Sequence, residues 1–274
     1  MNLDGHIHIG TGHPDAVDLS QRLARAEMAG GLLLSQAPAS FGGTIETTPP
    51  DERLENLLAW CSGEQHLYPF YWIDPVEIDA LNQVELALSH GVMGFKVICD
   101  HFYPGHVAAL ETFRAIAEAG KPILFHSGIL WDGKASSHFS RPVNFEALLG
   151  VDGLRFALAH ISWPWIDECL AVYGKLASAG RDNPGAAIEM FIDTTPGTPP
   201  IYRQEALTKL FTVGYDVARN VFFGSDNMAE GYRSGYTQEW VDRDRDILTQ
   251  IGVEAKTQDA VFGGNLRRFV GIEG

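Results

Sequence analysis

The segment Asp4-Gly5-His6-Ile7-His8 alternates polar and small or apolar side chains close to the start of the chain, and it decides how the rest is interpreted. Successive side chains of a β-strand face opposite sides, so we expect Asp4 and the two histidines on one face, opposite Gly5 and Ile7. Neutral imidazole is a common ligand of Zn²⁺ and similar ions, so two imidazoles aimed at one point indicate a metal site. The alternative is an exposed strand that carries two histidines.

Further polar residues stand on strand-like segments far down the chain. Three short apolar runs each end in a polar residue, and a loop follows that residue. A fourth run contains a lysine at a position where a packed strand would prefer an apolar residue. Buried parallel strands have this composition. The runs are Lys121–His126, Leu154–His160, Asn220–Asp226 and Gly91–Ile98, the last of which contains Lys96.

The spacing of these runs predicts the fold class. A chain of 274 residues divided into eight equal units gives about 34 residues per unit, the length of a strand, a loop, a helix and a return in a (β/α)₈ barrel. The polar residues then fall at the carboxyl ends of strands one, four, five, six and eight, the face on which such barrels build their active sites. We therefore expect an α/β protein with a single domain, residues 1–274, folded as one (β/α)₈ barrel.

The segments between these runs fit the same alternation. We expect a helix over Pro14–Ala29, which Gly30-Gly31 would end before a strand at Leu32–Leu34. Strand seven is expected at Ala186–Ile192, where we interpret Glu189 as one partner of a structural ion pair.

Composition excludes several classes of function. The formal net charge of -15 argues against a nucleic-acid or anionic-membrane partner, because phosphate binding relies on basic surface. No apolar run approaches the length of a membrane span. The cysteines are odd in number and form no Cys-x-x-Cys motif, so we expect neither disulfides nor a thiolate metal site, and a reducing cytoplasm as the location. They are Cys61, Cys99 and Cys169.

The ordered set of motifs resembles the amidohydrolase-related, metal-dependent hydrolases of TIM-barrel fold, and the resemblance covers nearly the whole chain. The turn Ser140-Arg141-Pro142 before strand six is also similar to that family. The motifs that carry the resemblance are Asp4–His8, Gly94–Lys96, Pro122–Gly128, Leu158–His160, Phe223–Asp226 and Gly264–Phe269.

The resemblance implies a divalent metal, usually zinc, with manganese as the other candidate. Its ligands, carried over to this chain, are His6, His8, His126 and Asp226. His160 corresponds to a residue that orients or deprotonates the attacking water in single-metal members and is a ligand in two-metal members. We expect one ion per chain, and two ions if Lys96 is a carboxylated bridge.

The proposed chemistry follows from charge. A metal lowers the pKa of bound water, and Asp226 can accept its proton while His160 stabilises the developing oxyanion or shares the proton transfer. The alternatives are a core histidine at His160 and a helix N-cap at Asp226. Lys96 keeps three interpretations: an ammonium that binds a substrate carboxylate or pairs with Asp4 or Asp226, a carboxylated bridge, or a structural ion pair.

The loop after strand five hints at the substrate. Residues Ile129–Arg141 supply an indole and two cations over the expected mouth of the barrel. With Lys96, we select Trp131 and Arg141 as candidate substrate-binding residues. This mixture suits a small ring or chain that bears a carboxylate or several hydroxyls.

Three functions remain open. The leading hypothesis is hydrolysis of a C–N or C–O bond in a small amide, lactone or ester. The second is non-oxidative decarboxylation of a small carboxylic acid, because the resemblance extends to aminocarboxymuconate-semialdehyde decarboxylase and its relatives. The third is a non-catalytic metal-binding barrel. The expected partner is a small-molecule substrate, and the interpretation leaves room for a homo-oligomer.

Overall fold

The computed structural model describes residues 1–41, 48–182 and 188–272. Within these ranges the strands are all parallel and form one sheet of order β8-β7-β6-β5-β4-β3-β2-β1-β9. The strands are β1 (Asn2–His8), β2 (Met28–Leu34), β3 (Leu67–Trp72), β4 (Gly94–Val97), β5 (Ile123–Phe125), β6 (Arg155–Leu158), β7 (Glu189–Asp193), β8 (Val221–Phe222) and β9 (Asn227–Met228).

The two short strands β8 and β9 are pieces of one interrupted strand that closes the sheet into a barrel. β8 pairs with β7, while β9 pairs with β1. Between them, the amide of Gly5 donates to the carbonyl of Phe223 (2.9 Å), and the amide of Asp226 donates to the carbonyl of His6 (3.0 Å). The expected eighth strand is therefore present but broken at the residues that reach the candidate site.

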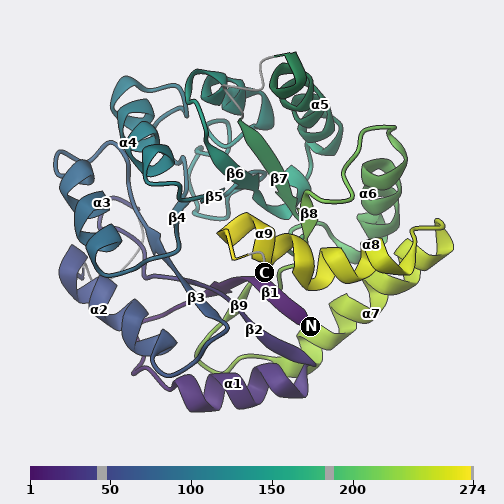
Figure 1. Cartoon of the computed structure of the whole chain (residues 1–274), viewed down its shortest axis with the longest axis horizontal. Coiled ribbons are helices and arrows are strands. Elements are labelled where there is room, and N and C mark those ends of the chain that lie inside the picture. The colour runs from purple at the N-terminus through teal and green to yellow at the C-terminus, as the bar shows by residue number, and fades with distance from the viewer. Residues whose placement is uncertain (42–47, 183–187, 273–274) are drawn as a thin grey trace.

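Helices surround the barrel (Figure 1). The α-helices are α1 (Ala16–Arg25), α2 (Pro50–Cys61), α3 (Ala80–Ser89), α4 (Val107–Glu118), α5 (Ile166–Asp182), α6 (Pro200–Thr212), α7 (Ser234–Gln250), α8 (Ala255–Asp259) and α9 (Asn265–Val270). Two 3₁₀ segments, Pro142–Gly150 and Ala159–Ser162, flank β6, and a π-helical turn, Ala260–Gly264, precedes α9. No helix in the described part of the chain is both long and apolar enough to cross a membrane.

The buried apolar residues form two layers. An outer cluster packs the helices against the strands, and an inner cluster fills the barrel. Leu266 and Phe269 of α9 belong to the inner cluster together with Leu3 and Phe222 of the strands, so α9 covers one end of the barrel. The candidate site can therefore open only at the other end, where the strands finish.

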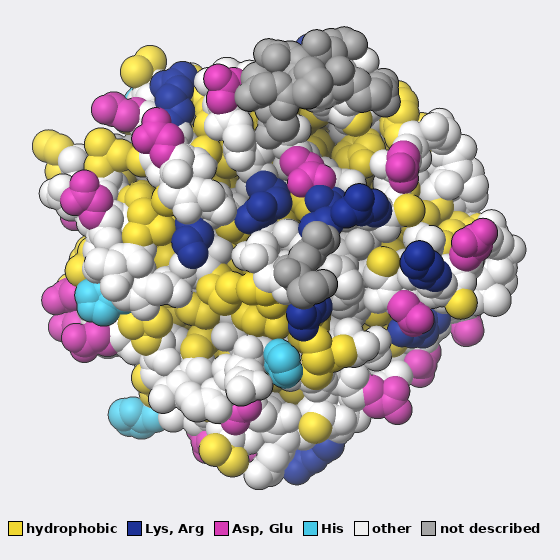
Figure 2. Space-filling model, viewed as in Figure 1, with side chains coloured by type: hydrophobic (Ala, Val, Ile, Leu, Met, Phe, Trp, Pro, Cys, Tyr) yellow, Lys and Arg dark blue, Asp and Glu magenta, His cyan; other side chains and the backbone are white. Residues whose placement is uncertain are grey.

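Basic side chains gather near the middle of the face that α9 covers, while acidic side chains dominate its edge (Figure 2). Two arginines, Arg155 of β6 and Arg268 of α9, have structural partners. Arg155 donates to the carbonyl of Phe269 (2.6 Å), and Arg268 pairs with Glu189 (2.6 Å). The structural ion pair expected for Glu189 is confirmed.

Three expectations about secondary structure differ from the fold. The first helix ends at Arg25, before Glu27 adopts a left-handed φ of 56°, and not at Ala29. Gly30 and Gly31 lie inside β2, where a Cβ on Gly31 would collide with the carbonyl of Asp4, so they serve close strand packing. Strand β7 begins at Glu189 and ends at Asp193, one residue later than the expected end at Ile192; positions 186–187 of the expected strand lie outside the described residues.

Candidate functional site

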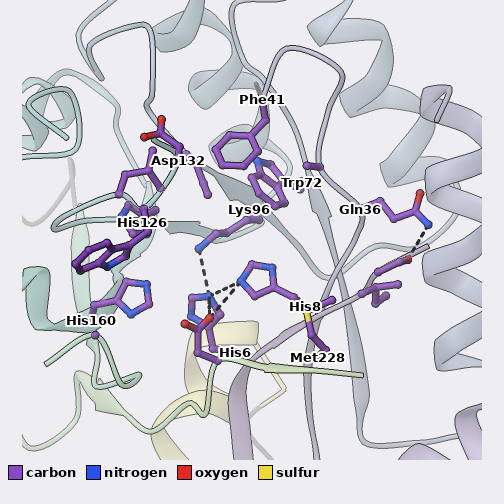
Figure 3. Close-up of a pocket in the computed structure, with 18 of the residues that line it drawn as sticks. His6, His8, Gln36, Phe41, Trp72, Lys96, His126, Asp132, His160 and Met228 are labelled. Atoms are coloured by element: carbon purple, nitrogen blue, oxygen red, sulfur yellow. Dashed lines mark hydrogen bonds and ion pairs between the residues drawn. The ribbon is translucent and has the colours of Figure 1, made fainter. Parts of the chain in front are cut away.

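The polar residues that end the strands face one cavity at the open end of the barrel (Figure 3). Its volume is about 1070 Å³. Strand β1 contributes two residues, β4 contributes one, and the loops that follow β5, β6 and β8 contribute one each. The cavity is lined in this way by His6, His8, Lys96, His126, His160 and Asp226. The structure thus brings together the residues singled out in the sequence as metal ligands and catalytic groups.

The tightest cluster in this cavity consists of His6, His8 and Asp226. The Nε2 atoms of the two histidines lie 3.2 Å apart. Asp226 Oδ1 lies 3.7 Å from Nε2 of His6 and 3.4 Å from Nε2 of His8. Because these donor atoms all fall within 4.8 Å of one another, they can converge on a single metal ion.

His126 and His160 stand beside this cluster. Their ring centroids lie 5.0 Å apart, and the ring of His160 lies 5.4 Å from that of His6. Burial lowers the pKa of both imidazoles, which favours the neutral form that binds metals. Within the described residues, His126 Nε2 and His160 Nδ1 are buried without a hydrogen-bond partner. Unsatisfied buried nitrogens are costly, so their presence indicates that the site binds a further group.

His160 and Asp226 both adopt left-handed backbone conformations, with φ of 62° and 60°. Such conformations cost energy in residues other than glycine and are concentrated at functional sites. Burial alone would raise the pKa of Asp226, but its hydrogen bond with His8 and the neighbouring charge of His6 hold that pKa well below its ordinary value. Asp226 is therefore an ionised carboxylate, able to bind a cation or accept a proton. This geometry does not fit a plain core histidine or a plain helix N-cap.

Asp193, at the end of β7, orients His6. Its Oδ2 lies 2.7 Å from Nδ1 of His6, and its other oxygen accepts hydrogen bonds from the amide and the hydroxyl of Thr195. Burial raises the pKa of Asp193 to about 6. A hydrogen bond from Nδ1 places the proton on that nitrogen and leaves Nε2 free to face the cavity. In the sequence, the one signal for this role of Asp193 is its position at the end of a strand.

Asp4 does not share a face with His6 and His8, contrary to the expectation from strand alternation. The pairing of β1 with β2 shifts register between Asp4 and Ile7, which breaks the period of two. The carboxylate of Asp4 instead accepts hydrogen bonds from the amide of Ser225 (2.8 Å) and the hydroxyl of Tyr232 (2.7 Å). Asp4 therefore ties β1 to the loop that carries Asp226.

Lys96 is buried at the centre of the site. Its side-chain nitrogen lies 3.5 Å from Nε2 of His6, and only 1% of the residue is exposed. Burial lowers the pKa of this amine to about 8, while the charges of Asp193 and Asp226 act in the opposite direction. Asp4 is occupied elsewhere, so the pairing of Lys96 with Asp4 is wrong. Its position suits an interaction with the reacting group of a substrate.

The two candidate substrate residues after β5 have different locations. Trp131 lines the cavity and is 84% exposed, as expected for a residue at its mouth. Arg141 is absent from the cavity lining; its Nε donates to Glu168 (2.9 Å), and its guanidinium lies 5.4 Å from the ring of Trp165. The structure therefore assigns Arg141 to the packing of the loop against α5, which corrects its expected role in substrate binding.

Comparison with known proteins gives a family and a fold. The family model described as Amidohydrolase matches residues 3–272. No curated protein sequence matches the chain.

Similar solved structures include an uncharacterised TIM-barrel protein from Bordetella bronchiseptica, with 12% identity, a TM-score of 0.70 and coverage of 98% of both chains. An amidohydrolase from Burkholderia multivorans with bound zinc shares 11% identity at a TM-score of 0.65, covering 98% of this chain and 99% of that one. A 2,6-dihydroxybenzoate decarboxylase shares 12% identity at a TM-score of 0.64, covering 100% and 99%. At these identities the structures establish the TIM-barrel fold.

Proposed function

The chain belongs to the amidohydrolase family, whose members are metal-dependent enzymes, and from this premise we propose that it hydrolyses the C–N or C–O bond of a small amide, lactone or ester. The observation that carries the proposal is the convergence of His6, His8 and Asp226 within 4.8 Å, in a cavity that also holds His126 and His160. Family membership also argues against a non-catalytic metal-binding barrel.

We assign the metal site to His6, His8, Asp226 and His126. The donor set of imidazoles and one carboxylate suits zinc, with manganese as the alternative. The buried Nε2 of His126, which lacks a partner among the described residues, supports its inclusion. When bound, the ion would supply Lewis-acid chemistry that activates water and polarises a carbonyl oxygen. We propose one ion per chain.

The remaining chemistry belongs to the side chains. The ionised carboxylate of Asp226 accepts a proton from the attacking water and returns it to the leaving group. His160, held beside His126 and His6, hydrogen-bonds the oxygen on which negative charge develops. The ammonium form of Lys96 adds positive charge at the same centre. Trp131 covers the mouth of the cavity over the bound substrate.

The test of this assignment separates metal binding from turnover. We expect His160→Asn to retain the metal content of the wild type and to lose roughly 10² to 10⁴ in turnover, the range for general acid–base help. His6→Ala should lose the metal itself. Metal analysis and rates on amides, lactones and esters, measured on one preparation, decide the matter. If His160→Asn loses an ion, the result would support a two-ion site. If the wild-type protein contains no metal after growth in medium with zinc and manganese, the proposal is overturned.

Decarboxylation of a small carboxylic acid is the second candidate, and Lys96 is the observation that favours it. A cation 3.5 Å from His6 is placed to hold a carboxylate at the reacting centre. Release of carbon dioxide from carboxylated rings, with no hydrolysis of any amide, lactone or ester, would select this function.

The proposal extends to cellular context. We propose that residues 1–274 act as one catalytic domain on a small-molecule substrate in the cytoplasm.

A further inference from the structure

The walls of the cavity differ in character from its floor. The floor holds the histidines, Lys96 and Asp226, whereas most of the side chains above it are aromatic or aliphatic. Those that form the walls include Phe41, Trp72, Ile98, Leu130, Trp163 and Met228. Polar side chains are fewer above the floor, where they are Thr11, Gln36, Thr48 and Asp132.

Formal charges follow the same division. Lys96 lies at the floor, and no other lysine or arginine is among the described residues that line the cavity. Away from the floor, the charged side chain is Asp132, whose carboxylate accepts hydrogen bonds from the amide of Lys134 (3.0 Å) and the hydroxyl of Ser136 (2.7 Å). A second anionic group on a substrate would meet apolar walls or this carboxylate, and burying an unpaired charge is costly.

One aromatic wall is rigid before any ligand arrives. The rings of Phe41 and Trp72 pack with centroids 4.9 Å apart (Figure 3). The amide of Trp72 donates to the hydroxyl of Ser35 (2.9 Å), and its carbonyl accepts from the buried guanidinium of Arg53 (2.8 Å). Because these bonds fix the backbone at the end of β3 and only 7% of Trp72 is exposed, this part of the wall is ordered before binding, at little entropic cost to a ligand that contacts it.

The size of the cavity admits a large ligand. Its volume of about 1070 Å³ is at the upper end of cavities that enclose drug-sized molecules. A simple amide or ester of a few heavy atoms would leave most of the apolar wall in contact with water. A larger aromatic group would cover more of it.

We propose that the substrate carries its negative charge only at the reacting end and that its remainder is a large, uncharged and mainly apolar group with an aromatic ring system. The inference rests on the proposed function, because that function places the reacting end of the substrate at the floor of the cavity. The apolar walls, which include the Phe41–Trp72 pair and Met228, bind the aromatic part, and Lys96 receives the negative charge of the acyl or carboxylate end. Dicarboxylates and compact polar acyl compounds are excluded.

The experiment measures equilibrium binding of three acids by titration calorimetry, so it requires no turnover. The probes are 2-naphthoate, the equally large dianion 2,6-naphthalenedicarboxylate, and acetate, each tested on the protein as purified and after removal of metal by a chelator. We expect 2-naphthoate to bind at least about 100-fold more tightly than either of the others. Equal affinity for the dianion, or no preference for 2-naphthoate over acetate, would overturn the inference.

Variants locate the binding surface. Trp72→Ala should weaken 2-naphthoate by about 10-fold or more and leave acetate unchanged. The matched control is Tyr103→Ala, which removes a half-exposed aromatic ring outside the cavity lining and should change neither. Met228→Lys changes a side chain that is 45% exposed, so folding should survive, and it should raise the affinity for the dianion while lowering that for 2-naphthoate. Unchanged affinities in both cavity variants would refute the assigned wall.

Failure of this inference and failure of the proposed function give different results. A protein that hydrolyses compact polar esters but shows no preference for 2-naphthoate contradicts the inference alone. A protein that binds 2-naphthoate through Trp72 but hydrolyses no amide, lactone or ester contradicts the hydrolase assignment alone.

Discussion

Replacement of Asp193 by asparagine should weaken metal binding without disturbing the fold. In the native protein, His6 donates from Nδ1 to the buried carboxylate of Asp193 over 2.7 Å. This bond fixes the proton on Nδ1 and leaves the lone pair of Nε2 directed at His8 and Asp226. Asparagine has nearly the same shape, but its amide nitrogen is a donor. When that nitrogen faces Nδ1, the imidazole must accept there and carry its proton on Nε2, the atom that would bind the ion.

The size of the effect follows from this change of tautomer. Loss of a partner that orients a metal-binding histidine typically costs 10- to 100-fold in metal affinity. That range corresponds to about 1.4 to 2.8 kcal/mol of binding free energy. Asp193→Ala should fall in the same range for a different reason, because it leaves the Nδ1 proton of His6 without an acceptor in a buried site.

The assay is competition for zinc between a chromophoric chelator and protein stripped of metal. Circular dichroism establishes that each variant is folded, and the increase in melting temperature on adding zinc should shrink in parallel with affinity. The matched control is Asp132→Asn, which changes a carboxylate at the cavity wall that contacts no histidine in the described structure. Zinc affinity of folded Asp193→Asn within about twofold of the wild type would refute the orienting role.

Three further perturbations test other parts of the structure. In Gly197→Ala, the new Cβ would lie 2.7 Å from Cβ of His160, so turnover should fall by about 10-fold or more while the metal content is retained. The control is Gly235→Ala, where the new Cβ enters open space, and its turnover should equal that of the wild type. In the native protein the guanidinium of Arg203 lies 2.5 Å from the carboxylate of Asp244, and Arg203→Met would leave that carboxylate buried and unpaired. The free energy of unfolding, measured by denaturant titration, should fall by roughly 3 to 5 kcal/mol, and a loss below about 1 kcal/mol would contradict this. Burial raises the pKa of all three cysteine thiols, to about 12 for Cys61 and Cys169 and well above its ordinary value for Cys99. The native protein should therefore alkylate slowly at pH 8 and react fully only when unfolded, and rapid labelling of the native protein would be the contrary result.

The barrel could be predicted from the sequence because its determinants repeat. Three of the segments that contribute to the site are apolar runs that end in a polar residue, at His126, His160 and Asp226. A fold that repeats one strand and one helix eight times returns every such end to the same rim, so residue spacing alone brings the side chains into one cavity. Arg141 lacks this support, because it lies deep in a long loop whose path no periodicity fixes. Its pairing with Glu168 depends on where α5 packs.

Which side chains enter the cavity depends on local departures from regular strand geometry. The register shift between Asp4 and Ile7 turns Asp4 away from the site, and left-handed backbones at His160 and Asp226 direct two polar groups there. Gly5 lies inside the shifted stretch and marks it in the sequence, because a glycine within a strand often accompanies a bulge. Positions 160 and 226 carry neither glycine nor asparagine, so no such residue marks their left-handed backbones. A left-handed residue other than glycine costs about 1 to 2 kcal/mol, so each must be held by tertiary contacts. For Asp226 one such contact is the bond from its amide to the carbonyl of His6, a pairing made across the junction where the barrel closes. The site geometry is thus a product of barrel closure, and a sequence pattern that specifies each strand separately cannot contain it.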